Sequence, residues 1–138
     1  MASDRPRVLI VDDEAENRIV LREVLLGEGI EVVGSVADGE RALWAARAVQ
    51  PDVVLMDLRM PGMGGLEAAR TITEAMPTVK VVILTVYEEP LPRRSAAEVG
   101  AYAYLVKGCS PALLRDIVMQ AWRAGLQERQ RGGGNGAA

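Results

Sequence analysis

Five short apolar runs, separated by segments with helical spacing, constrain the fold of this 138-residue chain more than any other feature. The run at residues 53–56, VVLM, has no polar break and is typical of a strand buried on both faces of a parallel sheet. The expected strands are residues 8–11, 31–36, 53–56, 81–84 and 102–106. The expected helices are residues 14–28, 38–50, 65–75, a short one near 93–99 after Pro90 and Pro92, and a last one from Ser110 onward. This alternation predicts an α/β fold with a doubly wound parallel sheet of five strands.

A polar residue follows four of the five runs. Asp12 and Asp13 follow the first run, Asp57 the third, Thr85 the fourth and Lys107 the fifth. The carboxyl ends of parallel strands lie at one edge of the sheet, where open α/β sheets bind their ligands. We therefore expect the topology to bring three carboxylates, a hydroxyl and an ammonium group together. The alternative, that each is an independent cap or turn residue, needs the same coincidence four times.

The chemistry that these groups permit is narrow. Three neighbouring carboxylates repel one another, so they must share a proton or a divalent cation. Oxygen ligands suit a hard ion, which predicts Mg²⁺, with Mn²⁺ as its substitute. Such an ion commonly bridges carboxylate and phosphoryl oxygens, and an aspartate can itself accept a phosphoryl group. The chain has no GxxxxGK[ST] motif, which excludes a nucleotide-binding P-loop.

Composition excludes several other classes. The net charge of −3 and the pI of about 5.1 do not indicate a basic surface that would bind nucleic acid. With no histidine and a single cysteine, Cys109, the chain has no nitrogen or sulfur site for a metal. The apolar runs are too short to span a membrane and MASDRPR is no signal peptide, so we expect a cytoplasmic protein without membrane contact.

These residues, set in the runs MDLRMPGMGG, ILT and AYLVK, resemble the receiver domain of bacterial two-component response regulators over residues 7 to about 124. The resemblance implies the flavodoxin-like fold with strand order 2-1-3-4-5. It implies that Asp57 accepts a phosphoryl group from the phosphohistidine of a sensor histidine kinase or phosphotransfer protein. The other implied roles are Mg²⁺ ligation by Asp12, Asp13, Asp57 and the backbone carbonyl of Arg59, phosphoryl contact by Lys107, and switching by Thr85 and Tyr104.

The runs DGERAL and AYLVKGCSPALL are similar to receivers of LuxR/NarL-type regulators, which continue into a DNA-binding domain. Two interpretations stay open: a stand-alone receiver, which we favour, and a receiver cut at its linker. We assign residues 1–131 to the receiver and residues 132–138 to a flexible glycine-rich tail or a truncated linker. The output is then a downstream protein partner or a missing domain, with no nucleic acid bound by this chain alone.

Four positions near the expected site depart from the family pattern or vary within it. Gly108 stands where many receivers have proline, so the peptide after Lys107 loses its usual reason to be cis. Val86 stands where the family prefers a small residue, and its branched side chain is expected to crowd the phosphoryl pocket. Arg59 and Tyr87 occupy the two variable positions that tune the lifetime of the phosphoryl group.

The last helix carries two apolar stripes. The first, which should face the sheet, consists of Leu114, Ile117, Val118 and Ala121. The second lies about a quarter-turn away at 100° per residue and should be at least partly exposed; it consists of Met119, Trp122 and Leu126. Peripheral core and a homodimer or partner surface around Trp122 both stay open. Trp44 is expected to be exposed.

Two competing functional classes are weighed against the receiver. A haloacid-dehalogenase-like phosphatase also forms an aspartyl phosphate, but it needs an acid two residues after the nucleophile, where this chain has Arg59. We therefore do not expect an enzyme. The second competitor is a receiver-shaped interaction module that is never phosphorylated. Val86 and Gly108 favour it, because they depart from the family pattern beside the phosphoryl pocket. Uptake of a small phosphodonor separates the two.

Overall fold

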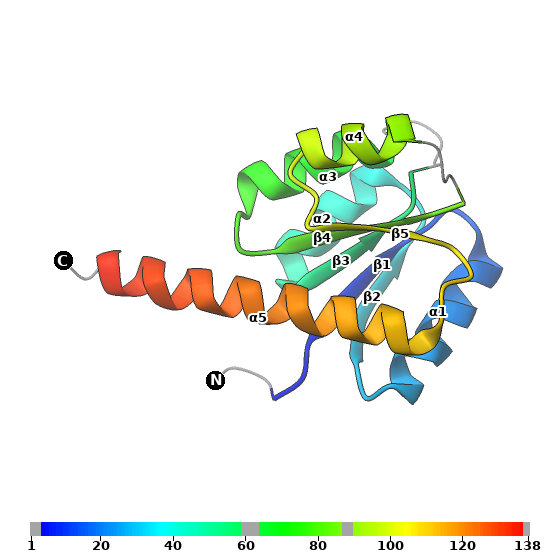
Figure 1. The fold of residues 1–138 in the computed structure, drawn as a ribbon, viewed down its shortest axis with the longest axis horizontal. Helices are drawn as coiled ribbons and strands as arrows, with labels where there is room; N and C mark the ends of the chain where they lie inside the picture. Colours follow the sequence, from blue (N-terminus) through cyan, green and yellow to red (C-terminus); the bar gives the residue numbers. More distant parts are fainter. Residues whose placement is uncertain (1–3, 59–63, 87–89, 137–138) are drawn as a thin grey trace.

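The protein folds as a five-stranded parallel β-sheet between two layers of helices (Figure 1). The structure is a computed structural model and describes residues 4–58, 64–86 and 90–136. The strands are β1 (Arg7–Val11), β2 (Glu31–Val36), β3 (Val53–Met56), β4 (Lys80–Thr85) and β5 (Ala103–Val106). The helices are α1 (Ala15–Gly27), α2 (Gly39–Val49), α3 (Gly65–Ala75), α4 (Pro90–Glu98) and α5 (Pro111–Gly136). The strand order β2-β1-β3-β4-β5 confirms the predicted flavodoxin-like fold.

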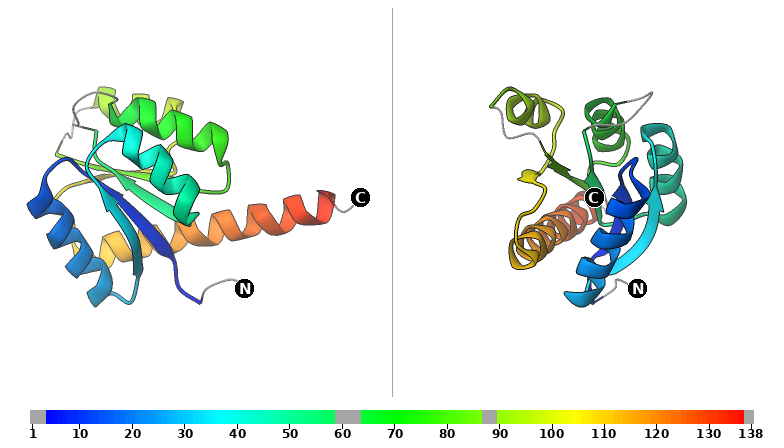
Figure 2. Two further views of the ribbon diagram at one scale, coloured as in Figure 1. Left: turned by 180° about the vertical axis from the view of Figure 1, so that it is seen from behind. Right: turned by 90° about the vertical axis from the view of Figure 1, so that its right-hand side faces the viewer.

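Alternating strand residues divide the core into two clusters, because successive side chains point to opposite faces of a sheet. Leu9 and Val11 pack in the cluster beneath α2, α3 and α4, whereas Val8 and Ile10 pack in the cluster beneath α1 and α5. The end-on view in Figure 2 shows the same division, with α1 and α5 on one side of the sheet and the other helices opposite. All of these strand residues are buried, as expected for a parallel sheet covered on both faces.

Side-chain caps fix where two of the helices begin. The Asp38 carboxylate accepts a hydrogen bond from the Arg41 amide at 2.8 Å, which starts α2 as predicted. The Ser110 hydroxyl accepts one from the Leu113 amide at 3.1 Å, which starts α5 with Pro111 in its first position. Within the described residues, no helix is both long and apolar enough to cross a membrane.

The fourth helix starts earlier than predicted. We expected it near residues 93–99, but α4 begins at Pro90 and includes Pro92. The first four amide groups of a helix have no acceptor within the helix, so a proline in the first turn costs no hydrogen bond. The two prolines therefore lie in the first turn of α4 and not in the segment before it.

The fifth helix is longer than predicted. It runs to Gly136, through most of the segment that we expected to be a flexible tail. Once a helix exists, each added residue gains one hydrogen bond, so a long helix can continue into glycines although each costs about 1 kcal/mol relative to alanine. In Figure 1 and in the reversed view of Figure 2, α5 extends well past the sheet.

Three contacts hold the second half of α5 against the amino ends of β3 and β4. Lys80, the first residue of β4, pairs with Glu128 at 2.7 Å. Asp52, directly before β3, accepts from the Arg129 guanidinium at 3.1 Å. Gly125 passes so close to the Thr78 carbonyl that a β-carbon there would lie 2.5 Å from it. The helix is thus fixed at its middle as well as at its start.

Candidate functional site

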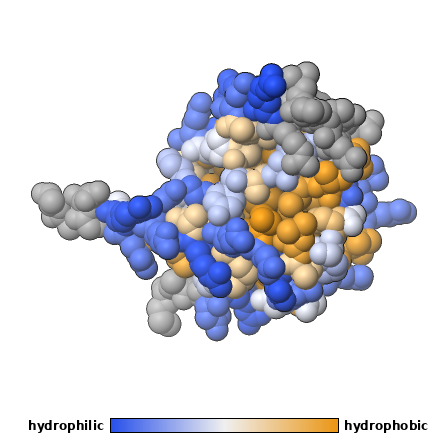
Figure 3. Space-filling view, in the orientation of Figure 1, coloured by the Kyte–Doolittle hydropathy of each residue, from blue (hydrophilic) through white to orange (hydrophobic). Residues whose placement is uncertain are grey.

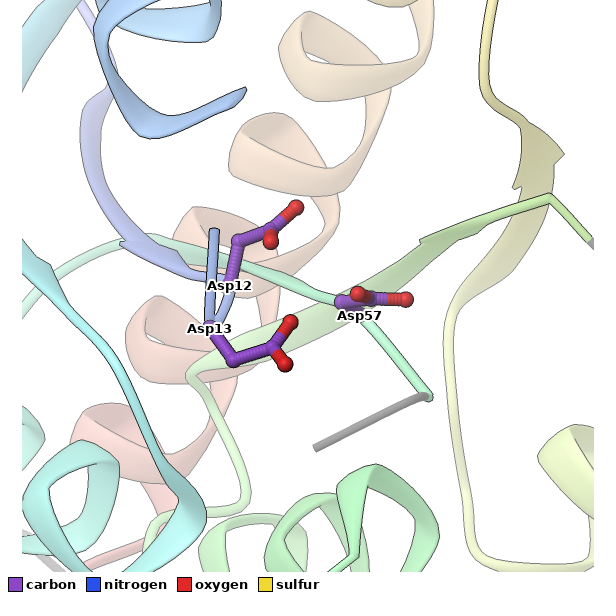
Figure 4. Close-up of side chains that lie close together, drawn as sticks. All are labelled: Asp12, Asp13 and Asp57. Atoms are coloured by element: carbon purple, nitrogen blue, oxygen red, sulfur yellow. The ribbon is translucent and has the colours of Figure 1, made fainter. Parts of the chain in front are cut away.

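Three carboxylates converge at the carboxyl edge of the sheet. Asp12 and Asp13 follow β1 and Asp57 follows β3, and carboxylate oxygens of all three lie within 4.8 Å of one another (Figure 4). Asp12 and Asp57 are only 1% and 5% exposed, whereas Asp13 is exposed. The structure therefore brings together the acidic set that the apolar runs predicted.

Strand register explains why these residues meet. Val11 of β1 pairs with Met56 of β3, so the residue that follows each strand emerges at the same level of the sheet. The Asp57 amide donates to the Val11 carbonyl at 2.9 Å, and the Asp12 amide donates to the Val36 carbonyl of β2 at 3.1 Å. The backbone of both acids is thus an extension of the sheet, which fixes where their side chains start.

Lys107 from the end of β5 bridges two of the acids. Its Nζ lies 2.8 Å from Asp12 Oδ2 and 3.3 Å from Asp57 Oδ2. Burial by itself lowers the pKa of this lysine, but the hydrogen bond to Asp12 and the charges of Asp57 and Asp12 outweigh it and raise the pKa above its ordinary value. The amine is therefore held in its charged form between the carboxylates.

Gly108 directs the chain after Lys107 through its backbone conformation. Its φ of +93° lies in the left-handed region that favours glycine. Among the described residues no peptide bond is cis, so the Lys107–Gly108 peptide is trans. The Lys107 amide also donates to the Thr85 carbonyl at 2.7 Å, and this contact holds the lysine backbone beside β4.

Thr85 and Tyr104 lie on the same face of the sheet. Thr85 is two residues after Ile83 in β4, Ile83 pairs with Tyr104 in β5, and Tyr104 packs half-buried against the cluster beneath α2, α3 and α4. The Thr85 side chain is fully buried, yet its Oγ1 has no hydrogen-bond partner among the described residues. A buried hydroxyl without a partner costs free energy unless a ligand or water satisfies it.

Known proteins resemble this chain in sequence and in fold. A sequence model of the response regulator receiver domain matches residues 8–119. The chain belongs to this family. It is 46% identical over 108 residues to the response regulator GacA of Pseudomonas viridiflava, covering 77% of this chain and 50% of that protein. It is also 46% identical over 106 residues to the response regulator UvrY of Escherichia coli strain K12, covering 75% of this chain and 48% of that protein.

The chain spans about half the length of the curated relatives that it matches, and the match lies in the receiver. Among solved structures, a LuxR-family two-component response regulator from Aurantimonas sp. SI85-9A1 has a TM-score of 0.82 at 31% identity, covering 87% of this chain and 86% of that chain. CheY in a CheX-CheY-BeF3-Mg complex from Borrelia burgdorferi has a TM-score of 0.79 at 26% identity, covering 84% and 88%. Both the family and its LuxR/NarL-type branch were predicted correctly.

The remaining positions predicted for the receiver site fall in two groups. Val86 is 53% exposed and lines the open cavity that also contains Asp13, Asp57 and Lys107, so it forms part of the wall. Arg59 and Tyr87, the two predicted tuning residues, lie outside the described residues, as does the Arg59 carbonyl predicted to bind the ion.

On α5, the second apolar stripe is half-buried, which agrees with the expected partial exposure. Met119, Trp122 and Leu126 all have intermediate exposure, and Trp122 packs against the cluster beneath α1 and α5. Trp44 on α2 is 78% exposed, as predicted. Burial raises the pKa of the Cys109 thiol, which favours its protonated form.

Arg18 contacts the acidic loop and was not among the residues predicted for the site. Arg18 of α1 donates from Nη1 to the Asp12 backbone carbonyl at 2.7 Å. The only signal in the sequence is an arginine in the first turns of the helix that follows the acidic pair. Such an arginine is usually solvated, so its contact was not predictable from spacing.

Proposed function

We propose that this receiver domain accepts a phosphoryl group on Asp57 from the phosphohistidine of a partner histidine kinase or phosphotransfer protein. The observation that carries the proposal is the convergence of Asp12, Asp13, Asp57 and Lys107 at one edge of the sheet. Phosphorylation then changes the surface of α4, β5 and α5, which controls a downstream protein partner or an output domain. Figure 3 supports this surface, because hydrophobic side chains gather over β5 and the neighbouring part of α5.

The donor set fits a magnesium ion. The oxygens of the three carboxylates are hard ligands, and both Asp12 oxygens already accept hydrogen bonds, Oδ1 from the Glu14 amide at 2.9 Å and Oδ2 from Lys107. We therefore propose Asp13 and Asp57 as direct ligands of Mg²⁺ or Mn²⁺, with the Arg59 carbonyl, and Asp12 acting mainly through water. When bound, the ion neutralises negative charge on the phosphoryl oxygens.

The proposed transfer assigns one task to each side chain. An Asp57 carboxylate oxygen forms the new bond to phosphorus while the bond from phosphorus to the histidine nitrogen breaks, and that nitrogen keeps the electron pair. The Lys107 ammonium, now shared with Asp12, pairs with a phosphoryl oxygen. The Thr85 hydroxyl, which has no hydrogen-bond partner among the described residues, donates to a phosphoryl oxygen. Tyr104, on the same face of the sheet, follows Thr85 inward.

Three neighbouring positions are proposed to tune the rate. Val86 narrows the cavity from one side, because it lines the cavity beside Asp57 and Lys107. Arg59 and Tyr87 are proposed to shield the phosphoryl group from attacking water. Residues 1–131 are proposed to form the receiver domain, with residues 132–138 outside it.

The deciding experiment is intact mass spectrometry after incubation with acetyl phosphate and Mg²⁺. We expect the wild type to gain one phosphoryl group, the gain to need Mg²⁺, and Asp57→Ala to gain none. The matched control is Asp116→Asn, an exposed acid on α5, which should gain the group like the wild type. Absence of any gain in the wild type would contradict phosphorylation and leave the second candidate, a receiver-shaped interaction module that is never phosphorylated.

The half-buried stripe on α5 supports a further proposal, a homodimer through this helix. Light scattering coupled to size exclusion should show a dimer of the phosphorylated wild type that Leu126→Lys disrupts. The control is Leu26→Lys, which changes an exposed leucine of α1 and should leave the mass unchanged. A monomer at every soluble concentration, with and without phosphorylation, would rule out the homodimer.

A further inference from the structure

The loop that carries Asp12 and Asp13 is held from several directions. The Asp12 amide donates to Val36, its Oδ1 accepts from the Glu14 amide, and its Oδ2 accepts from Lys107. Its carbonyl accepts from Arg18 at 2.7 Å, the shortest of these contacts. Every polar group of Asp12 is therefore bound within the protein, and the arginine supplies the contact to the carbonyl that leads into Asp13.

Asp13 depends on this loop for its direction. Its carboxylate is exposed and, among the described residues, has no hydrogen-bond or ion-pair partner. The direction of a side chain without partners is set by the backbone that carries it and by its own rotamer preferences. In Figure 4 the Asp13 side chain nevertheless lies beside Asp57, on the side where the acids converge. The bonds made by Asp12 fix the backbone from which the Asp13 side chain starts.

Four groups contact Asp12: the Val36 carbonyl, the Glu14 amide, the Lys107 amine and the Arg18 guanidinium. Of these, only the Arg18 guanidinium is a side chain that binds the backbone carbonyl of Asp12. The arginine lies in the first turns of α1, and its own amide bonds to the Glu14 carbonyl at 3.1 Å, so its backbone belongs to the helix. Its half-buried side chain reaches back over the loop to the Asp12 carbonyl. The guanidinium also carries a positive charge next to a site where three carboxylates face one lysine.

We infer that Arg18 is a positioning residue, which clamps the Asp12 carbonyl and thereby aims the Asp13 carboxylate at the cation shared with Asp57. This inference rests on the proposed function. Residues that orient metal ligands without touching the metal commonly contribute tenfold or more to affinity. The contact of Arg18 is with a backbone carbonyl and not with a carboxylate oxygen, so its removal should weaken cation binding and leave the transfer itself intact once the ion is bound.

The test compares Arg18→Met, Arg18→Lys and the wild type by calorimetric titration with Mg²⁺. We expect Arg18→Met to weaken Mg²⁺ binding about tenfold, with the maximal rate of phosphorylation by acetyl phosphate at saturating Mg²⁺ within about twofold of wild type. Arg18→Lys, which keeps the charge and a donor, should recover part of the affinity. Arg22→Met, an exposed arginine one turn further along α1, is the control and should bind Mg²⁺ like the wild type.

A second readout needs no ion. Hydrogen exchange of the Glu14 amide, which is bonded to Asp12 Oδ1, should be faster in ion-free Arg18→Met than in ion-free wild type, because the loop has lost one of its contacts. The same amide in Arg22→Met should exchange at the wild-type rate. Together the two readouts separate loop positioning from any role of Arg18 in contacting a phosphodonor protein.

The outcomes distinguish the inference from the proposed function. Unchanged Mg²⁺ affinity in Arg18→Met, or a maximal rate that stays low at saturating Mg²⁺, would overturn the positioning role while phosphorylation of the wild type stands. If the wild type neither binds Mg²⁺ nor gains a phosphoryl group, the proposed function itself fails. Should circular dichroism show that Arg18→Met does not fold, Arg18→Lys decides, and wild-type affinity in that variant overturns the inference.

Discussion

The two edges of the β-sheet arrange charge in opposite ways. At the amino edge, Asp52 is 8% exposed and accepts from the Arg7 amide at 2.9 Å and from Arg129 at 3.1 Å, while Lys80 pairs with Glu128. At the carboxyl edge, three carboxylates converge, and Lys107 pairs with two of them, Asp12 and Asp57. At the amino edge each of these acids has its own basic partner, whereas at the carboxyl edge the acids outnumber the basic groups that pair with them.

The difference separates stabilising contacts from functional ones. Groups at the amino edge already have their partners and hold β1, β3, β4 and α5 together. The acids at the carboxyl edge repel one another, and among the described residues the nearby buried Thr85 hydroxyl has no hydrogen-bond partner. We therefore expect this edge to contribute less to the stability of the fold than the amino edge. Proteins tolerate such local conflicts mainly at functional sites, where a ligand resolves them.

The largest expected effect comes from two helix glycines, one at each edge. A β-carbon at Gly65 would lie 2.2 Å from the Asp57 carbonyl oxygen, and one at Gly125 would lie 2.5 Å from that of Thr78. We expect Gly65→Ala and Gly125→Ala each to lower the free energy of unfolding by about 2 to 3 kcal/mol in urea titrations, because backbone atoms must move.

Only the Gly65 substitution displaces Asp57, so only Gly65→Ala should also slow phosphorylation by acetyl phosphate. Gly27→Ala is the control, since nothing lies within 4 Å of its β-carbon position. Equal phosphorylation of Gly65→Ala and Gly125→Ala would show that the two edges are not functionally distinct.

The next effect concerns the buried acid at the amino edge. Asp52→Asn removes the charge that Arg129 and the Arg7 amide contact, and hydrogen bonds to a charged group contribute about 1.5 to 3 kcal/mol. We expect a loss of about 2 kcal/mol in the free energy of unfolding, independent of Mg²⁺. A stability that depended on Mg²⁺ in this variant more than in the wild type would contradict the separation of the two edges.

The corresponding change at the carboxyl edge should have the opposite sign. Asp57→Asn removes one of three repelling carboxylates, so without divalent ions we expect a gain of about 1 kcal/mol in the free energy of unfolding. Added Mg²⁺ should raise the melting temperature of the wild type and have little effect on Asp57→Asn, because a ligand stabilises only a state that binds it. A destabilised Asp57→Asn would mean that the pair with Lys107 outweighs the repulsion.

The smallest effect is expected away from both edges. Trp44→Ser changes a side chain on the outer face of α2 that is 78% exposed. Surface changes of this kind usually alter stability by less than about 0.5 kcal/mol, and phosphorylation should be unchanged. A larger loss in urea titrations would show that Trp44 has contacts in solution with another molecule.

Much of the carboxyl edge was predictable from the sequence and little of the amino edge was. Asp12, Asp57 and Lys107 each follow an apolar run, and parallel topology places such positions together without knowledge of any side chain. The pair of Asp52 with Arg129 joins residues 77 apart through a long side chain on a helix, and no run or period marks it. The contact of Arg18 with Asp12 was missed because no run or period in the sequence marks it either.

Helix boundaries failed where composition misled. Pro90 was taken as a break, although a first turn accommodates proline, and the glycine-rich end was taken as flexible, although α5 continues to Gly136. The second stripe on α5 was expected to be at least partly exposed, and Trp122, which is half-buried, packs against the core cluster beneath α1 and α5.

The sequence separation between the acids and Lys107 has a consequence for biosynthesis. Lys107 contacts Asp12 across 95 residues, so the acids emerge from the ribosome long before the lysine that compensates them. Domains fold largely as units once their sequence is complete. A nascent or broken chain that lacks β5 thus carries the proposed acceptor and its neighbouring acids without Lys107, so we expect phosphorylation to favour finished and folded molecules.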